Sequence, residues 1–248
     1  MNNINNNYNE DEWANRVNLA ACYHLADHFG YSDIIWNHIT AKTSSKKNTF
    51  LINEFGLRYD EITASNLVEI NLEGKIINGN PKINETGYII HGAIHKARHD
   101  IECVMHTHSQ AGMAISCLNE GLIPMVQDSA MFYNRISYHS WEGMSTDKEE
   151  CFRLSKSLGK NNSMILRNHG LITCGATIPE AFMLMYYLDK ACKNQIDIMS
   201  TGMKANIPTN NIMEYAAGQY DDPRFKLGVH EWPALLRLLD DKKSIYRN

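Results

Sequence analysis

The stretch Glu102-Cys103-Val104-Met105-His106-Thr107-His108 decides how the rest of the chain is interpreted. Its apolar middle, with no residue before His108 that breaks an extended chain, predicts a β-strand. Residues two apart on a strand project from the same face, so His106 and His108 are expected to point together from its C-terminal end. This geometry suits one metal ion, and His169 in the turn Asn168-His169-Gly170 is a candidate third ligand.

Three imidazole ligands leave one coordination position open for a substrate or water. Imidazole suits zinc, copper, iron and nickel, and zinc is the commonest ion at such an open site. An open zinc can polarise a carbonyl group and hold the enolate or enediolate that forms beside it. Taken alone, however, the His-x-His pair is weak evidence, and the Asn-His-Gly segment can equally be an ordinary turn.

A second histidine cluster competes with the first. His91, His95 and His99 recur every four residues in a predicted helix, and histidines four apart on a helix can also bind a metal. The segment lacks the Glu of the His-Glu-x-x-His pattern, and Ile90, Ile94 and Ala97 are predicted to form its buried face. We therefore expect His91 to be a partly buried neighbour of the site.

Composition narrows the class of protein. The chain has 248 residues, 44% of them hydrophobic, and a net charge of −4, which predicts one α/β domain and gives no reason to expect nucleic acid or a membrane as partner. Six cysteines without a CxxC pair favour a reducing cytoplasm. The first ten residues lack a signal-peptide pattern, and no segment has the roughly 18 to 20 apolar residues of a membrane span. We expect a soluble, cytoplasmic protein.

Periodicity divides the chain into a disordered tail over 1–10, a domain over 11–199 and an extension over 200–248 that carries a short amphipathic helix near its end. Helices are predicted over 11–30, 88–98 and 110–118, from Thr146, where Glu149 completes a capping box, and from Thr177 onward. Strands are predicted over 34–42, 50–53, 68–72, 75–77, 103–108, 163–167 and 171–174.

Several segments together resemble the class II aldolase and adducin head-domain family, which includes enzymes of the fuculose-phosphate aldolase type. The likeness extends over about 11–199 and is carried by segments 36–41, 87–98, 104–108 and 166–172, and the ending 232–240 resembles the adducin-like branch. The resemblance implies a three-layer α/β/α fold around a mainly antiparallel central sheet. It also implies a homotetramer with active sites between subunits.

The resemblance further implies a zinc-dependent aldehyde-lyase that cleaves a small hydroxy-carbonyl compound, sugar-like or sugar-phosphate-like, through a metal-stabilised enediolate. The metal ligands map onto His106, His108 and His169, with another divalent transition metal as the alternative to zinc. The family's acid/base Glu falls at Gly87, so the nearest carboxylate, Glu85, and the aromatic Tyr133 are the proton-transfer candidates. Glu85 can equally be a solvated loop residue, and Tyr133 a packed aromatic.

The substrate-binding candidates come from the same resemblance. Asn37 and His38 lie in the family's Asn-containing substrate loop, and Gly56 and Thr86 lie in its two phosphate loops. Phe55 occupies a hydroxyl position there, and Glu54 and Glu85 would repel a dianion, so the sequence does not favour a phosphorylated substrate. Two other functions stay open: a non-catalytic, adducin-like interaction module, and an epimerase, dehydratase or decarboxylase that uses the same metal site.

Overall fold

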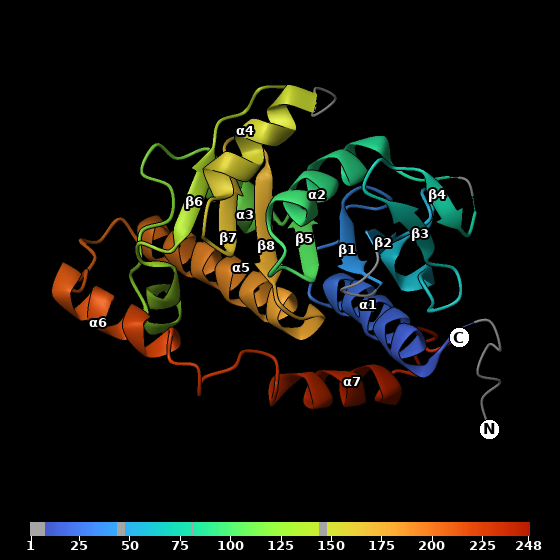
Figure 1. Ribbon diagram of the computed structural model, residues 1–248. Helices are drawn as coiled ribbons and strands as arrows, with labels where there is room; N and C mark the ends of the chain where they lie inside the picture. Colours follow the sequence, from blue (N-terminus) through green and yellow to red (C-terminus); the bar gives the residue numbers. More distant parts are fainter. Residues whose placement is uncertain (1–7, 44–47, 81, 144–147) are drawn as a thin grey trace.

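The computed structural model describes residues 8–43, 48–80, 82–143 and 148–248, apart from the side chains of residues 85, 86, 148 and 151. One sheet of eight strands runs through the molecule in the order β4-β3-β2-β1-β5-β8-β7-β6 (Figure 1). Its pairs are antiparallel except β6 with β7. The strands are β1 His38–Lys42, β2 Thr49–Ile52, β3 Val68–Asn71, β4 Ile76–Asn78, β5 Cys103–Thr107, β6 Ile136–His139, β7 Ser163–Leu166 and β8 Gly170–Gly175.

Helices cover both faces of this sheet. Figure 1 shows α2 and α4 in front of it, while α1 and α5 lie along its other face and lower edge. The predicted α/β/α fold with a mainly antiparallel sheet is confirmed. The helices are α1 Glu10–His28, α2 Glu85–Ala97, α3 Gln110–Ser116, α4 Lys148–Leu158, α5 Ile178–Ser200, α6 Asn210–Tyr220 and α7 Glu231–Asp241, with short 3-10 helices η1 Tyr59–Glu61 and η2 Gln127–Phe132.

Each face of the sheet has its own core. Successive strand residues point to opposite faces, so Met105 of β5 joins the core under α1 and α5, whereas Val104 joins the core under α2 and α4. Strand β1 pairs with β5 in the register His38 to His106 and Thr40 to Val104. These four residues therefore share the α2 face of the sheet.

The C-terminal segment packs onto this body. Helix α6 lies against η2, and the predicted amphipathic helix is α7, which lies along α1 (Figure 1). The indole of Trp232 donates a hydrogen bond to Asn18 Oδ1 (2.9 Å). Tyr246 is fully buried, and its carbonyl accepts from the backbone of Ala64 (3.0 Å). The proposed division at residue 200 therefore separates segments that are in contact.

Several element ends differ from the sequence prediction. Helix α2 begins at Glu85, three residues earlier than predicted, so the expected loop at 84–87 is largely a first helical turn. Strand β1 begins at His38, because the preceding residues form a tight turn closed by an isolated bridge between Asp33 and Trp36. Of the predicted tail, residues 1–7 lie outside the described part, while Asn9 caps α1. Thr146 also lies outside the described residues.

Two general properties follow from the described residues. None of their helices is long and apolar enough to cross a membrane. The thiols of five cysteines are free, four of them buried, as expected for small apolar side chains in a core.

Candidate metal centre

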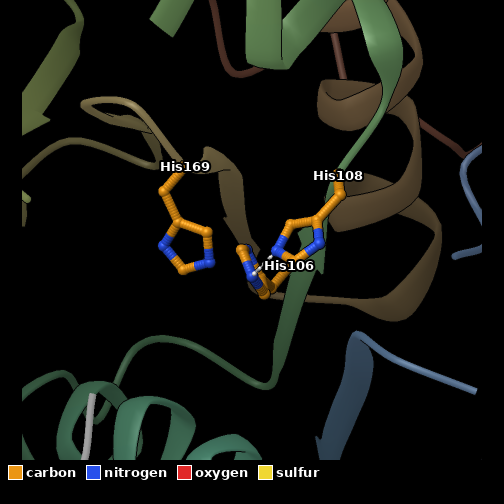
Figure 2. Close-up of side chains that lie close together, drawn as sticks. All are labelled: His106, His108 and His169. Atoms are coloured by element: carbon orange, nitrogen blue, oxygen red, sulfur yellow. Dashed lines mark hydrogen bonds between the residues drawn. The ribbon is translucent and has the colours of Figure 1, made fainter. Parts of the chain in front are cut away.

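Three histidines converge where β5 and the β7–β8 turn meet. His106 belongs to β5, His108 follows that strand, and His169 lies in the turn; Figure 2 shows their rings side by side. One nitrogen of each ring lies within 4.8 Å of the others, and the ring centroids are 4.8 to 4.9 Å apart. His106 is buried, whereas His108 and His169 are partly exposed. Solvent can therefore reach the cluster from their side.

The turn that carries His169 is shaped by its two neighbours. Asn168 has a φ of +55°, a left-handed conformation that Asn tolerates better than most residues. A Cβ atom on Gly170 would collide with the carbonyl oxygen of Thr107, so only glycine lets the turn approach β5 this closely. The Asn-His-Gly segment thus brings the third imidazole to the end of the histidine strand.

Hydrogen bonds fix the orientation of two of these rings. Nδ1 of His106 donates to the carbonyl of Leu171 (3.0 Å), and Nδ1 of His108 donates to the Asp33 carboxylate (3.0 Å). A neutral imidazole carries one N–H, so both Nε2 atoms are left with a lone pair. These two Nε2 atoms lie 3.1 Å apart. Two facing lone pairs repel each other unless a cation lies between them.

The separation of the Nε2 atoms of His106 and His108 suits two ligands of a tetrahedral metal ion. Two nitrogens bound to zinc at about 2.0 to 2.1 Å lie about 3.3 Å apart, close to the separation of the two Nε2 atoms. Burial, with a smaller contribution from the neighbouring histidines, lowers the pKa of His169 to about 4 and the pKa of His106 well below its usual value. The rings of His106 and His169 are therefore neutral near pH 7, which is the form that binds a metal.

The Asp33 partner was not found from the sequence. It lies in the turn before β1, where Ile34 has a φ of +53°, an uncommon conformation for a β-branched residue, and an exposed side chain. The backbone N–H of Trp36 donates to the carbonyl of Asp33 (2.8 Å), which closes the turn. A carboxylate behind a metal-binding imidazole orients the ring and makes it a stronger ligand.

Two of the predicted substrate-binding residues, Asn37 and Gly56, lie on neighbouring loops, whereas His38 begins β1 and Thr86 belongs to α2. Asn37 is buried with a φ of +68°, and neither polar atom of its side chain has a hydrogen-bond partner within the described part of the chain. Such an orphaned buried amide is rare in proteins and suits a ligand. Gly56 lies in an exposed turn with a φ of +101°. The rings of Trp36 and Phe55, 5.6 Å apart, join the two loops.

The two predicted proton-transfer residues belong to other elements of the chain, α2 and the segment after η2. Glu85 and Thr86 belong to the first turn of α2, but their side chains lie outside the described part of the structure. Tyr133 follows η2, which packs on α5 and α6, and no hydrogen bond or ring contact joins its side chain to the three histidines among the described residues. The structure therefore does not bring Tyr133 into contact with the triad.

The competing cluster does not converge. Among the described residues, the histidines, cysteines and acidic groups arranged to hold a metal are His106, His108 and His169. His99 is exposed after the end of α2, while His91 and His95 are fully buried rather than partly exposed. Their rings turn toward β1 instead of toward a common metal position.

An α/β/α protein with an open histidine triad at a strand end is the class that this fold and site define. The family model for the Class II Aldolase and Adducin N-terminal domain matches residues 17–196, and the chain belongs to this family. The resemblance read from the sequence motifs is thereby confirmed. Members of this family typically use a divalent metal, and the triad provides three ligands for one.

Two relatives show how wide the family is. A Pseudomonas aeruginosa protein named as a candidate class 2 aldolase is 44% identical over 241 residues, covering 95% of this chain and 93% of the relative. Alpha-adducin of Rattus norvegicus is 38% identical over 250 residues, covering 94% of this chain and 34% of adducin. The chain thus matches a whole bacterial protein and about a third of a longer eukaryotic one.

Two solved structures have the same fold. An aldolase II superfamily protein from Pseudomonas syringae superposes with a TM-score of 0.93 at 39% identity, covering 100% of both chains. The L-fuculose 1-phosphate aldolase from Glaciozyma antarctica PI12 superposes with a TM-score of 0.84 at 26% identity, covering 96% of this chain and 93% of that one. The agreement extends through the C-terminal segment as well as the sheet.

Proposed function

We propose that the chain is a metal-dependent aldehyde-lyase that acts on a small hydroxy-carbonyl compound. It would cleave the C–C bond between the carbon next to the carbonyl group and the hydroxyl-bearing carbon, which becomes an aldehyde. The ligands would be His106, His108 and His169, and zinc is the preferred ion because three imidazoles and an open position suit it. The observation that carries this proposal is the pair of Nε2 lone pairs facing each other at 3.1 Å. Two rings held in this arrangement by Leu171 and Asp33 are prepared for a cation.

Bound zinc would supply Lewis-acid polarisation of the substrate carbonyl and stabilise the enediolate produced by cleavage. The chain's own residues would orient the substrate. The Asn37 side chain offers a donor and an acceptor to substrate hydroxyl groups, and it has no other partner among the described residues. Asp33 would keep His108 in the tautomer that presents Nε2.

The nature of the substrate is part of this proposal. The Glaciozyma antarctica neighbour is named for a phosphorylated sugar, which supports a sugar-like hydroxy-carbonyl skeleton here. Glu54 and Phe55 lie on the loop of Gly56, and a carboxylate there disfavours a phosphate dianion. We therefore include unphosphorylated keto-sugars beside sugar phosphates as substrates.

The assembly is also a proposal. A homotetramer with sites between subunits would allow Tyr133 of a neighbouring subunit to approach the triad, and a cytoplasmic setting agrees with the free cysteines. Light scattering of the purified protein measures the mass directly. A monomer at micromolar concentration would contradict the shared-site arrangement.

The test of the proposed function is metal analysis followed by product analysis. Wild-type protein is expected to bind one zinc per chain and to release an aldehyde and a ketone from members of a sugar panel. His106→Ala should lose both properties, whereas the exposed His99→Ala is the matched control and should keep them. If neither zinc nor another divalent metal binds to the wild-type protein, the lyase proposal fails.

A non-catalytic, adducin-like interaction module is the second candidate. It is favoured by the 38% identity to alpha-adducin and by Gly87, which offers no acid/base side chain. Metal binding without conversion of any panel member would support this candidate. An epimerase, dehydratase or decarboxylase on the same site would convert panel members without releasing aldol fragments, so the same product analysis separates the three functions.

A further inference from the structure

A line of buried polar side chains extends from the metal centre between β1 and α2. Nδ1 of His38 lies 3.0 Å from Nε2 of His91, and Nδ1 of His91 lies 2.8 Å from the Thr40 hydroxyl. The same hydroxyl lies 2.9 Å from Nε2 of His95. All four side chains are at most 3% exposed. Three hydrogen bonds thus link His38 to His95 through the interior.

The line forms because residues two apart on a strand and residues four apart on a helix are separated by nearly the same distance. His38 and Thr40 are two apart on β1 and share a face, about 6.6 Å apart along the strand. His91 and His95 are four apart on α2 and share a face, about 6 Å apart along the helix. The strand pair and the helix pair therefore lie side by side in matched register.

Gly87 makes room for the first member of the line. A Cβ atom on Gly87 would lie 2.6 Å from Cδ2 and 2.9 Å from Cγ of His38, distances at which atoms overlap. The His38 ring therefore occupies the space that any side chain at position 87 would need. The space beside position 87 is therefore filled by an imidazole from β1 and not by a side chain from α2.

The ring of His38 lies beside the ring of His106. His38 pairs with His106 across β1 and β5, and their ring centroids are 5.4 Å apart. Because Nδ1 is bonded to His91, the remaining ring nitrogen is Nε2, which makes no hydrogen bond within the described part of the chain. His38 can therefore offer Nε2 to a substrate at the triad.

The hydrogen bonds of the line can all run in one direction or all in the other. The three rings are buried, and a neutral imidazole has one N–H, so each ring donates one hydrogen bond at a time. If His38 donates to His91, then His91 donates to Thr40, Thr40 donates to His95, and Nε2 of His38 has a lone pair. If every bond reverses, Nε2 of His38 carries a proton.

The far end of the line approaches the surface. Nδ1 of His95 is buried without a hydrogen-bond partner among the described residues. His95 lines a crevice of about 180 Å³ together with Lys42, Thr49, Phe50, His99 and Glu102. A water molecule in this crevice could exchange a proton with His95, which would allow the line to reverse.

We propose that His38 is the catalytic residue that takes and returns the substrate proton, and that His91, Thr40 and His95 are positioning residues that set which form of Nε2 it presents. This inference rests on the proposed lyase function. In the cleavage direction, the hydroxyl group on the carbon that becomes the aldehyde gives its proton to His38 Nε2. The electron pair of that O–H bond then forms the aldehyde C=O bond. The C–C bond breaks, its electron pair forms the enediolate, and the proton on Nε2 returns to the enediolate carbon.

Hydrogen exchange on a ketone tests the proton step without C–C cleavage. Dihydroxyacetone and hydroxyacetone in D₂O are expected to exchange their hydroxymethylene C–H for C–D in the presence of zinc-loaded wild-type protein, as measured by NMR. His38→Gln should lower this rate by about 10²- to 10⁴-fold, the usual contribution of an acid/base group, with its zinc content unchanged. Added imidazole should restore part of the rate in His38→Gly, which a purely structural role would not allow.

The positioning residues have a matched pair of variants. Thr40→Val removes at nearly constant volume the hydroxyl that bonds both His91 and His95. It should slow exchange by about tenfold or more, since one lost hydrogen bond is worth roughly a factor of ten. Thr40→Ser keeps the hydroxyl and should recover most of that loss. Equal exchange rates in Thr40→Val and Thr40→Ser would overturn the positioning role of the line.

A readout on metal-free protein completes the test. ¹⁵N NMR should show neutral, single-tautomer rings for His38 and His91, and Gly87→Ala should change their signals by displacing the His38 ring. Absence of zinc-dependent exchange in the wild-type protein would overturn the lyase proposal itself. Wild-type exchange that persists undiminished in His38→Gln, or His38 and His91 signals that Gly87→Ala does not change, would overturn the role of His38 alone.

Discussion

The two faces of β1 and β5 differ in chemical character although the same ten residues form both. The face toward α1 and α5 is apolar apart from Thr107, whose hydroxyl contacts Met185 of α5, and the face toward α2 is polar apart from one valine. Side chains alternate along each strand, so neighbours in sequence belong to different environments. The first face presents Ile39, Ala41, Cys103 and Met105, and the second presents His38, Thr40, Val104 and His106.

This difference separates stability from chemistry. Burial of the apolar face removes hydrocarbon from water and stabilises the fold by roughly 25 cal/mol per Å². The polar face costs desolvation, which its hydrogen bonds offset only in part, because Nδ1 of His95 has no partner among the described residues. A buried polar line of this kind is best explained by what it does at the metal centre.

Of the substitutions considered, Met105→Ala on the apolar face should lower stability most. Met105 is fully buried, and truncation of such a side chain typically lowers the free energy of unfolding by about 2 to 5 kcal/mol. Urea unfolding of the metal-free protein measures the loss. Zinc stoichiometry should stay at the wild-type value, since the ligands lie elsewhere. A loss below about 1 kcal/mol would mean that this face is not the stabilising one.

His95→Gln should remove part of the acid sensitivity that the polar face creates. Burial, with a further contribution from Lys42, lowers the pKa of His95 to about 3, whereas the unfolded chain binds that proton below about pH 6.5. The free energy of unfolding therefore falls as the pH falls through this window. From pH 7.5 to 4.5 the wild type should lose roughly 2 to 3 kcal/mol more than the variant.

Urea unfolding at several pH values measures this difference. The exposed His99→Gln is the matched control, because its ring is not buried. Parallel stability curves for wild type and His95→Gln would show that folded His95 takes up its proton over the same pH range as the unfolded chain. Burial between β1 and α2 would then not keep this ring neutral below about pH 6.5.

The convergence of His106, His108 and His169 could be predicted from the sequence because its signals are local. Strand alternation places His106 beside His108, and the turn around His169 depends on the two residues that flank it, Asn168 and Gly170. The sheet and its helices also followed from periodicity and from the family motifs. Strand β6 was missed, because its pairing with β7 is parallel and arises from the crossover through α4.

The surroundings of the triad could not be predicted, because they depend on contacts between distant segments. Asp33 reaches His108 across 75 positions of sequence, through a turn with no periodic pattern. Thr40 meets His91 only because β1 pairs with β5 in one register and α2 packs across that pair. Neither the strand register nor the position of a helix on a sheet can be read from local sequence.

Asp33→Ala should weaken the metal centre while leaving both faces of the sheet intact. Removal of a carboxylate behind a ligating imidazole typically costs about 10- to 100-fold in metal affinity. Asp33 is half exposed, so the fold should be little affected. Competition with a zinc-binding dye measures the affinity, and Asp60→Ala, which removes an exposed carboxylate on η1, is the control. Equal zinc affinities would show that His108 is oriented without Asp33.

Ile39→Val should have the smallest effect on stability. It tests within one strand whether a change on the apolar face leaves metal binding and hydrogen exchange unaltered. Ile39 lies between His38 and Thr40, but its fully buried side chain points to the apolar face. Loss of one methylene typically costs about 0.5 to 1.5 kcal/mol of stability. Zinc affinity and ketone hydrogen exchange should match the wild type, whereas Thr40→Val one position away should slow exchange. If Ile39→Val slowed exchange as much as Thr40→Val, any disturbance of β1 would suffice, and the direction of its side chains would not separate stability from chemistry.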